Sequence, residues 1–155
     1  MNPAITFYGG GGDSANYTGE SLYSCVIDHF DQQKIWERYL GTKEGVSAGI
    51  NVAEADYLHG NDIQILVIYN HVNDARGFDN GVDHAEQGII LAEALNIPDN
   101  VALFVDIESD YPVDSAFLEG WYEILSTSSY TPAFSIKKAN SPKRTMRWEK
   151  IYKRI

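Results

Sequence analysis

Residues 101–108 read Val-Ala-Leu-Phe-Val-Asp-Ile-Glu, an apolar run that ends in two acidic residues. Side chains alternate between the two faces of a β-strand, which divides this run into an apolar face and a face that carries both acids. The apolar face holds Val101, Leu103, Val105 and Ile107. We therefore predict a strand that packs on helices through that face, while Asp106 and Glu108 emerge together at its carboxyl end.

The same kind of segment recurs along the chain, and amphipathic helical patterns separate the copies. Further strands are predicted at residues 4–8, 35–40, 63–70 and 131–135, and helices at residues 22–30, 52–59, 82–95 and 114–125. Asn51, Asn80 and Asp114 are the expected helix N-caps, with Glu54 as the capping-box partner of Asn51. Strict alternation of strand and helix indicates a parallel sheet with right-handed crossovers.

Two architectures fit this order, an open doubly wound sheet and part of a (β/α)₈ barrel. A complete barrel typically takes about 250 residues and at least about 200. The chain has 155 residues, and its predicted strands are spaced as closely as barrel strands are. The predicted fold class is therefore α/β and TIM-barrel-like, truncated to about four or five βα units.

Charge divides the chain into a predicted barrel domain at residues 1–136 and a basic tail at residues 137–155. The first segment has 21 acidic and four basic residues, and the second has eight basic residues and one acid. An acidic body repels nucleic acid and anionic membrane surfaces, so neither is an expected partner. The tail is a solvated end or a partner-binding helix. The abrupt change of charge also fits a truncated or frame-altered copy of a longer barrel.

The chain has no apolar run approaching the length of about 20 residues that a membrane span needs. Its first six residues lack the basic and apolar regions of a secretory signal. We expect a cytoplasmic protein, or one that leaves the cell by a non-classical route. The lone Cys25 forms no intramolecular disulfide framework, and the oligomeric state is left open.

Asp106 and Glu108 are the candidate catalytic residues. Glycosidic cleavage uses a carboxyl group that protonates the leaving oxygen and a second one that activates water or stabilises positive charge on the sugar. Two like charges so close also raise the pKa of one of them. The alternatives are acids that only solubilise a strand end, or a bridged divalent metal. Because no histidine stands beside them at ligand spacing, we predict no metal site.

Four further residues are candidate substrate-binding groups. Tyr69 and Asn70 end the strand at 63–70, and Asn70 reaches the same edge as Asp106 if its face points inward. Arg38, near the end of an earlier strand, pairs with a carboxylate, clamps a ligand or is simply a surface charge. Asp13 follows the glycine run 9–12, which lacks a nucleotide-binding motif and is interpreted as a flexible loop that ends the first strand. No cofactor is predicted.

Several segments together resemble one bacterial family. They are residues 36–42, Glu54, residues 65–70, 81–85, 92–98 and 104–108. Over roughly residues 34–134 they are similar to DUF1906, the Rv2525c-like glycoside hydrolase-like domains, which are distantly similar to GH25 muramidases. The resemblance implies a (β/α) barrel with a carbohydrate-linked role at the cell wall. It also implies Asp106 and Glu108 as the acid pair, with Arg38 and Asn70 beside them.

Two departures from the family stand out: the first strand's turn matches loosely, and the later barrel strands are replaced by the basic tail. The resulting hypothesis is a glycosidase acting on peptidoglycan or a related glycan. The alternatives are a non-catalytic carbohydrate-binding or cell-wall-associated domain, and an inactive truncated fragment.

Overall fold

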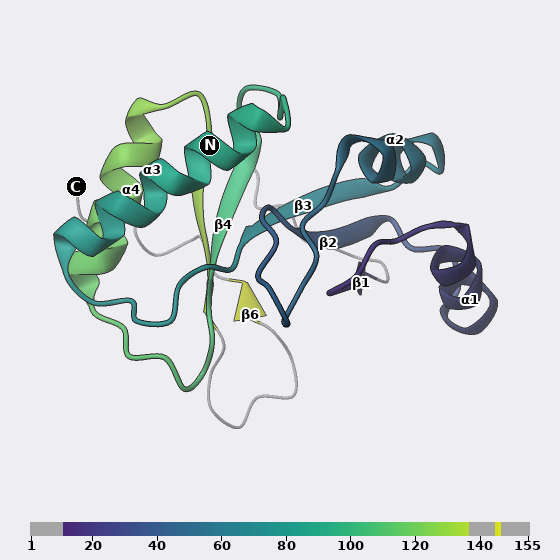
Figure 1. Cartoon of the computed structure of the whole chain (residues 1–155), viewed down its shortest axis with the longest axis horizontal. Helices are drawn as coiled ribbons and strands as arrows, with labels where there is room; N and C mark the ends of the chain where they lie inside the picture. The colour runs from purple at the N-terminus through teal and green to yellow at the C-terminus, as the bar shows by residue number, and fades with distance from the viewer. Residues whose placement is uncertain (1–10, 137–144, 147–155) are drawn as a thin grey trace.

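The strands lie across the sheet in the order in which they occur in the chain (Figure 1). A computed structural model describes residues 11–136 and 145–146. The strands are β1 (Gly11–Asp13), β2 (Ile35–Tyr39), β3 (Gln64–Tyr69), β4 (Ala102–Ile107), β5 (Thr131–Ile136) and β6 (Thr145–Met146). The helices are α1 (Glu20–Phe30), α2 (Val52–Gly60), α3 (Phe78–Ala94) and α4 (Ser115–Thr127). The first five strands are parallel, and β6 is antiparallel to β5.

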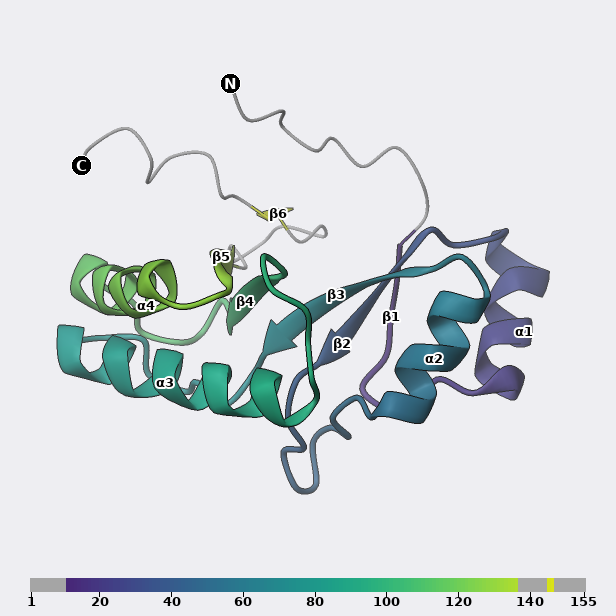
Figure 2. The ribbon, with the colours of Figure 1, turned by 90° about the horizontal axis from the view of Figure 1, so that it is seen from above.

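All four helices of the described chain lie on the same side of the sheet (Figure 2). A doubly wound fold places helices on both faces, so this arrangement favours the barrel-like architecture. The sequential strand order is likewise that of a (β/α) barrel. The α/β class is thus confirmed, and the fold is consistent with a TIM barrel. Within the described residues the strands form an open series from β1 to β6.

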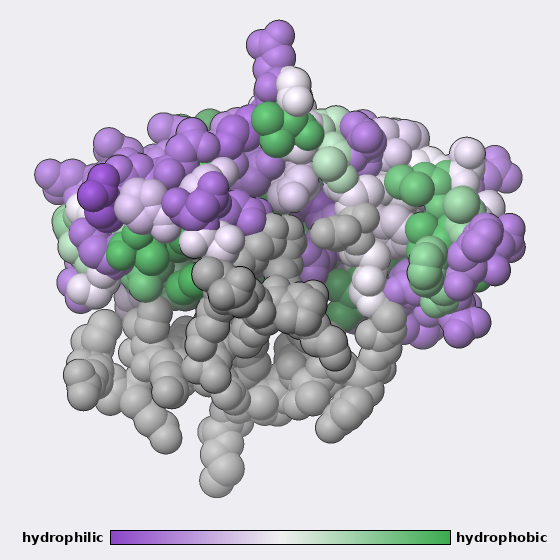
Figure 3. Space-filling view, turned by 90° about the horizontal axis from the view of Figure 1, so that it is seen from below, coloured by the Kyte–Doolittle hydropathy of each residue, from purple (hydrophilic) through white to green (hydrophobic). Residues whose placement is uncertain are grey.

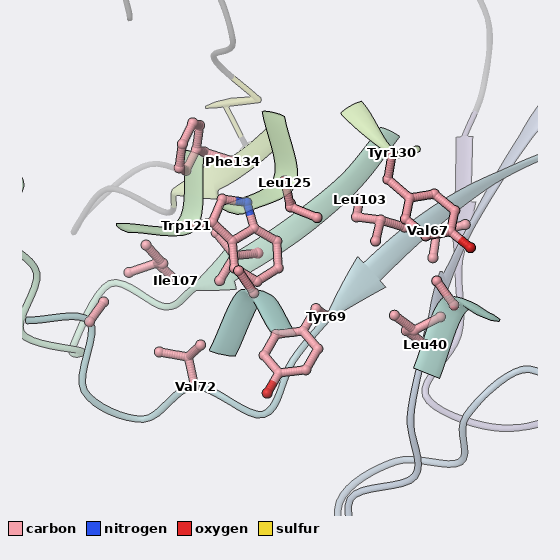
Figure 4. Close-up of a cluster of buried hydrophobic side chains, with 14 of the residues drawn as sticks. Leu40, Val67, Tyr69, Val72, Leu103, Ile107, Trp121, Leu125, Tyr130 and Phe134 are labelled. Atoms are coloured by element: carbon pink, nitrogen blue, oxygen red, sulfur yellow. The ribbon is translucent and has the colours of Figure 1, made fainter. Parts of the chain in front are cut away.

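The largest hydrophobic cluster joins the helix-facing side of β3, β4 and β5 to α3 and α4 (Figure 4). Leu103, Val105 and Ile107 are completely buried there, as the alternation along residues 101–108 predicted. Trp121 and Leu125 of α4 are also completely buried and pack in the same cluster. Full burial stabilises each such aliphatic side chain by about 1.5–3 kcal/mol. Because this cluster occupies the helix-facing side, functional groups at the carboxyl ends of these strands must lie on the opposite face.

Two glycines let α3 and α4 approach each other closely. A Cβ atom on Gly81 would lie 2.2 Å from the carbonyl oxygen of Phe117. A Cβ atom on Gly120 would lie 2.2 Å from the carbonyl oxygen of Phe78. Both contacts are with backbone, which cannot rotate away as a side chain can, so any larger residue must push the two helices apart.

We predict that Gly120→Ala lowers the free energy of unfolding by about 1–3 kcal/mol, the usual cost of overpacking. Gly60→Ala is the matched control, because no atom lies within 4 Å of a Cβ at that helical position. Urea unfolding followed by circular dichroism measures both variants. Equal stabilities of Gly120→Ala and the wild type would show that the helices separate at no cost.

Arg38 lies in a second packed region, between β2 and α2. Its guanidinium group is completely buried and forms a two-pronged ion pair with Glu54, with N···O distances of 2.6 and 3.0 Å. It also donates to the carbonyl oxygens of Ser14 and Ala48. The backbone N–H of Thr18 donates to the same Glu54 carboxylate at 2.7 Å. These bonds tie the β1–α1 loop, the β2–α2 loop and α2 together.

The predicted pairing of Arg38 with a carboxylate is confirmed, and its guanidinium lies away from the face on which substrate binding was predicted. Arg38 shares a strand face with Trp36, which packs among Tyr23, Leu58 and Ile63 on the helical side. All the hydrogen bonds described for the guanidinium go to protein groups, and none of its surface is exposed. A ligand on the other face of the sheet would therefore not reach it.

We predict that Arg38→Met lowers the free energy of unfolding by about 3–5 kcal/mol, because it leaves the Glu54 carboxylate buried without its counter-charge. Arg76→Met is the control, since the Arg76–Asp74 pair is largely exposed and worth at most about 1 kcal/mol. Chemical denaturation measures both. A cost for Arg38→Met no greater than that for Arg76→Met would contradict the assigned structural role.

Two local predictions were also wrong, and a third is not tested. Gly11 and Gly12 form β1 instead of ending a strand, because the missing side chain of Gly12 leaves room for the Trp36 ring, 3.0 Å from where a Cβ would stand. Helix α3 begins at Phe78 after Gly77, and Asn80 lies inside it and donates to the Asp74 carbonyl. The predicted strand at 4–8 lies outside the described residues.

The remaining helix predictions have a mixed outcome. Asn51 and Asp114 cap their helices as predicted, each accepting a hydrogen bond from the N–H three residues later. Glu54, however, turns its carboxylate to Arg38 and not back to the cap. In α1 the side chain that is buried is Tyr23, whereas the predicted apolar residue Phe30 is 72% exposed.

The outer surface is mixed in character. Hydrophilic side chains cover much of what the described residues present in Figure 3, with smaller hydrophobic patches between them. Large exposed apolar side chains such as Phe30, Val46 and Ile90 come from separate elements. Among the described residues no helix is long and apolar enough to cross a membrane.

Candidate functional site

The face of the sheet away from the helices carries its own small core. Ile68, Phe104 and Ala133 are buried there and lie in register on β3, β4 and β5. Tyr39, Leu66 and Ala102 pack against them. These residues form a layer across the sheet, as inward-pointing side chains do in a (β/α) barrel.

The next row toward the carboxyl ends of the strands is polar. Asp106 follows Phe104 on the same face of β4 and pairs in register with Ser135 of β5. Asn70 comes directly after Tyr69, whose register partner is Val105, so it is next to Asp106 in the sheet. Asp106 is 4% exposed and Ser135 1%. The structure therefore brings Asn70 and Asp106 together, and it adds Ser135, which the sequence analysis had not singled out.

Glu108 stands just beyond the end of β4 and is half-buried. It is thus more accessible than the buried Asp106. Cavities of about 450 and 340 Å³ occur elsewhere on the molecule. The first lies at the amino ends of β4 and β5, beside Tyr122 and Tyr130, and the second between α2 and the end of α3. Neither is lined by the two acids.

Asn70 is held in one orientation by a neighbouring loop. Its amide Nδ2 donates to the hydroxyl of Ser47 at 2.9 Å, and Ser47 is itself buried in the β2–α2 loop. Within the described chain, no group donates to the buried amide oxygen Oδ1. Asn70 therefore offers a fixed carbonyl acceptor. Its neighbour Ser47 is a second residue that sequence reasoning missed, because a loop serine carries no pattern.

Tyr69, predicted to bind substrate, points to the helical side of the sheet. It is completely buried in the cluster of Figure 4, with its ring centroid 5.6 Å from that of Trp121. Its hydroxyl lies 2.8 Å from His84 Nδ1 and donates to Gln87 at 3.1 Å. Burial raises the pKa of Tyr69 to about 12, so the phenol stays neutral in this network.

Asp13 ends β1 and pairs in register with Glu37, which in turn pairs with Leu66. Leu66 lies on the same strand face as Asn70 but four residues before it. The register therefore does not bring Asp13 into the row that Asn70 and Asp106 share. In the part of the chain that the structure describes, no group of three or more His, Cys, Asp or Glu residues is arranged to hold a metal ion.

Comparison with known proteins bears on this arrangement. Residues 31–138 match the Rv2525c-like, glycoside hydrolase-like domain. The chain belongs to this family. The match includes β2 to β5 and thus both strand ends that carry Asn70 and Asp106, and it confirms the resemblance found in the sequence.

A solved structure extends the similarity. The chain is 33% identical to an uncharacterized B. stearothermophilus protein of known crystal structure, with a TM-score of 0.80. The alignment covers 82% of this chain and 60% of that one, so this Rv2525c-like chain spans about three fifths of the length of its relative. The comparison with curated proteins found no match.

We predict that His84 makes stability depend on pH. Burial lowers its pKa below the ordinary value of 6.5, with His71 adding to the shift and Asp83 opposing it. As pH falls through about 6.5, His84 becomes protonated in the unfolded chain while it stays neutral in the folded chain. The free energy of unfolding therefore falls as pH drops from about 6.5 toward the lowered pKa of the folded state. Above pH 6.5 this contribution is complete.

Denaturant unfolding at several pH values between 5 and 8 measures this slope. His84→Gln should flatten it, while His59→Gln, on the exposed end of α2, controls for the loss of an imidazole. An unchanged slope in His84→Gln would assign the pH dependence to other groups.

Proposed function

We propose that this chain is a glycoside hydrolase-like domain that acts on a bacterial cell-wall glycan through Asp106 and Glu108. The observation that carries the proposal is the position of Asp106, on the helix-free face at the carboxyl end of a central strand. Active sites of (β/α) barrels are built at that end of the strands. Membership of the glycoside hydrolase-like family supports the same chemistry.

In the proposed reaction the two carboxyl groups divide the work. One donates a proton to the glycosidic oxygen, and the other stabilises the positive charge that develops on the sugar or activates a water molecule. Asn70 is proposed to orient a sugar hydroxyl through its fixed carbonyl group, and Asp13, at the end of β1, to bind substrate outside the row of Asn70 and Asp106. The catalytic assignment and the glycan substrate are both part of the proposal.

The proposal extends to the architecture. Since the sheet is parallel, sequential and covered by helices on one side, we propose that it corresponds to the leading part of a TIM-barrel-like fold. The chain spans 60% of the length of the solved relative.

Clearing of a suspension of purified bacterial cell walls tests the activity. We expect the wild type to clear it and Glu108→Gln and Asp106→Asn to slow clearing by about 10²–10⁴-fold, the usual contribution of a general acid or base. Asp110→Asn, an exposed acid two residues beyond Glu108, is the matched control and should keep full activity. Thermal unfolding of each variant establishes that the fold is intact.

Full activity of Glu108→Gln, or no clearing by the wild type, would contradict hydrolysis. Glycan binding that persists without clearing, and is the same in Glu108→Gln, would favour a non-catalytic carbohydrate-binding domain instead.

A further inference from the structure

Helices α2 and α3 lie on the same side of the sheet (Figure 2), and a cavity of about 340 Å³ lies between α2 and the end of α3. Its walls are mainly apolar and include Val52, Ala55, Ile65, Val67, Leu95 and Ile97. Binding sites for small molecules are typically clefts of about 300–1,000 Å³, lined by apolar side chains with a few polar groups. The sheet residues of this wall belong to the helix-facing cluster, so the cavity lies on the opposite face from Asp106.

The cavity follows one face of α2. Val52, Ala55, Asp56 and His59 line it, at positions i, i+3, i+4 and i+7 of that helix. At a rise of 1.5 Å per residue, these positions extend over about 10 Å of the helix. The cavity is therefore long enough for a short hydrocarbon chain that lies parallel to α2.

Several apolar side chains of the cavity are still in contact with water. Val52 is 54% exposed. Ile65, Leu95 and Ile97 pack against the main hydrophobic cluster but are only partly buried. Removal of such apolar surface from water is favourable. A ligand that carries a hydrocarbon chain therefore gains free energy in this cavity, whereas a ligand that is polar throughout does not.

Negative charge is concentrated at one end of the cavity. Helix α2 ends at Gly60 and α3 at Ala94, and both ends border the cavity, through His59 and Leu95. The carboxyl end of a helix carries a partial negative charge, which favours a cation. Asp56, in the second half of α2, adds a full negative charge, and it is the one acid among the described residues that line the cavity. This end of the cavity therefore favours a positively charged head group.

We propose that this cavity binds an aliphatic amine. The hydrocarbon chain lies along the apolar face of α2, and the ammonium group lies at Asp56, beside the carboxyl ends of α2 and α3. A carboxylate head group on the same chain is repelled at that end. The proposal is independent of the proposed glycan chemistry, because neither Asp106 nor Glu108 lines the cavity.

Titration of the ¹⁵N-labelled full chain, followed by two-dimensional NMR, measures the affinity and locates the site. Octylamine is the probe, octanoate reverses the charge of the head group, and butylamine shortens the chain. We expect octylamine to shift the amide resonances of Ala55, Asp56 and Asn96. Octanoate should bind at least about tenfold more weakly because of its charge, and butylamine at least about tenfold more weakly because it buries half as long a chain.

Two variants separate the apolar and the charged contributions. Ala55→Phe fills the cavity and should weaken octylamine binding at least about tenfold, while Ala53→Phe, at an exposed position of α2 outside the cavity, is the matched control. Asp56→Asn should reduce the preference for octylamine over octanoate by about three- to tenfold. Asp28→Asn, which removes an exposed acid of α1, is its control. Thermal unfolding establishes that each variant is folded.

No binding of octylamine, equal affinities for octylamine and octanoate, or unchanged affinity in Ala55→Phe would overturn the proposal. A wild-type dimer that Ala55→Phe converts to a monomer in analytical ultracentrifugation would also overturn it, because a second copy would then occupy the cavity. Clearing of cell walls is a separate readout that Ala55→Phe and Asp56→Asn should leave unchanged. Failure of the hydrolytic function is thus distinguished from failure of this proposal.

Discussion

The two-residue alternation of side chains along β3, β4 and β5 governs the rest of this structure. One set of residues, including Leu103, Val105 and Ile107, packs against α3 and α4. Because the helices lie on one side of the sheet, the other set is left to form a thin apolar layer and then a polar row. Any chemistry at the carboxyl ends of these strands must therefore come from residues in phase with Phe104.

The charged residues also differ between the helix-facing side of the sheet and its helix-free face. The first 136 residues carry 21 acids and four basic residues, yet the one basic residue described as completely buried, Arg38, is used to neutralise Glu54 inside the protein. A buried ion pair is retained at the junction of three chain segments, where its hydrogen bonds hold two loops and a helix. Arg38 is thus engaged with Glu54 and not with the acids of the proposed glycan site.

The alternation of side chains also explains which residues could be assigned to a strand face from the sequence. The placement of Asp106 was predictable, because the helix-facing residues of its strand are uniformly apolar and only one phase can carry the acids. Tyr69 could have been assigned correctly as well, since it is out of phase with Asn70. Arg38 could not, because each phase of β2 carries one charged residue, Glu37 in one and Arg38 in the other, so polarity does not distinguish the two faces. Helix starts such as Phe78 depended on loop contacts, which carry no periodic signal.

The sequence by itself determined the α/β class, the positions of the central strands, the family and the strand face of Asp106, because each is recorded in local periodicity or in motifs of adjacent residues. Only the tertiary structure decided which side the helices occupy, that Arg38 belongs to the packed side, and that Ser47 binds Asn70 next to Asp106 and Ser135. These are relations between residues 16 or more positions apart, set by strand register and crossover direction, and no local pattern encodes them.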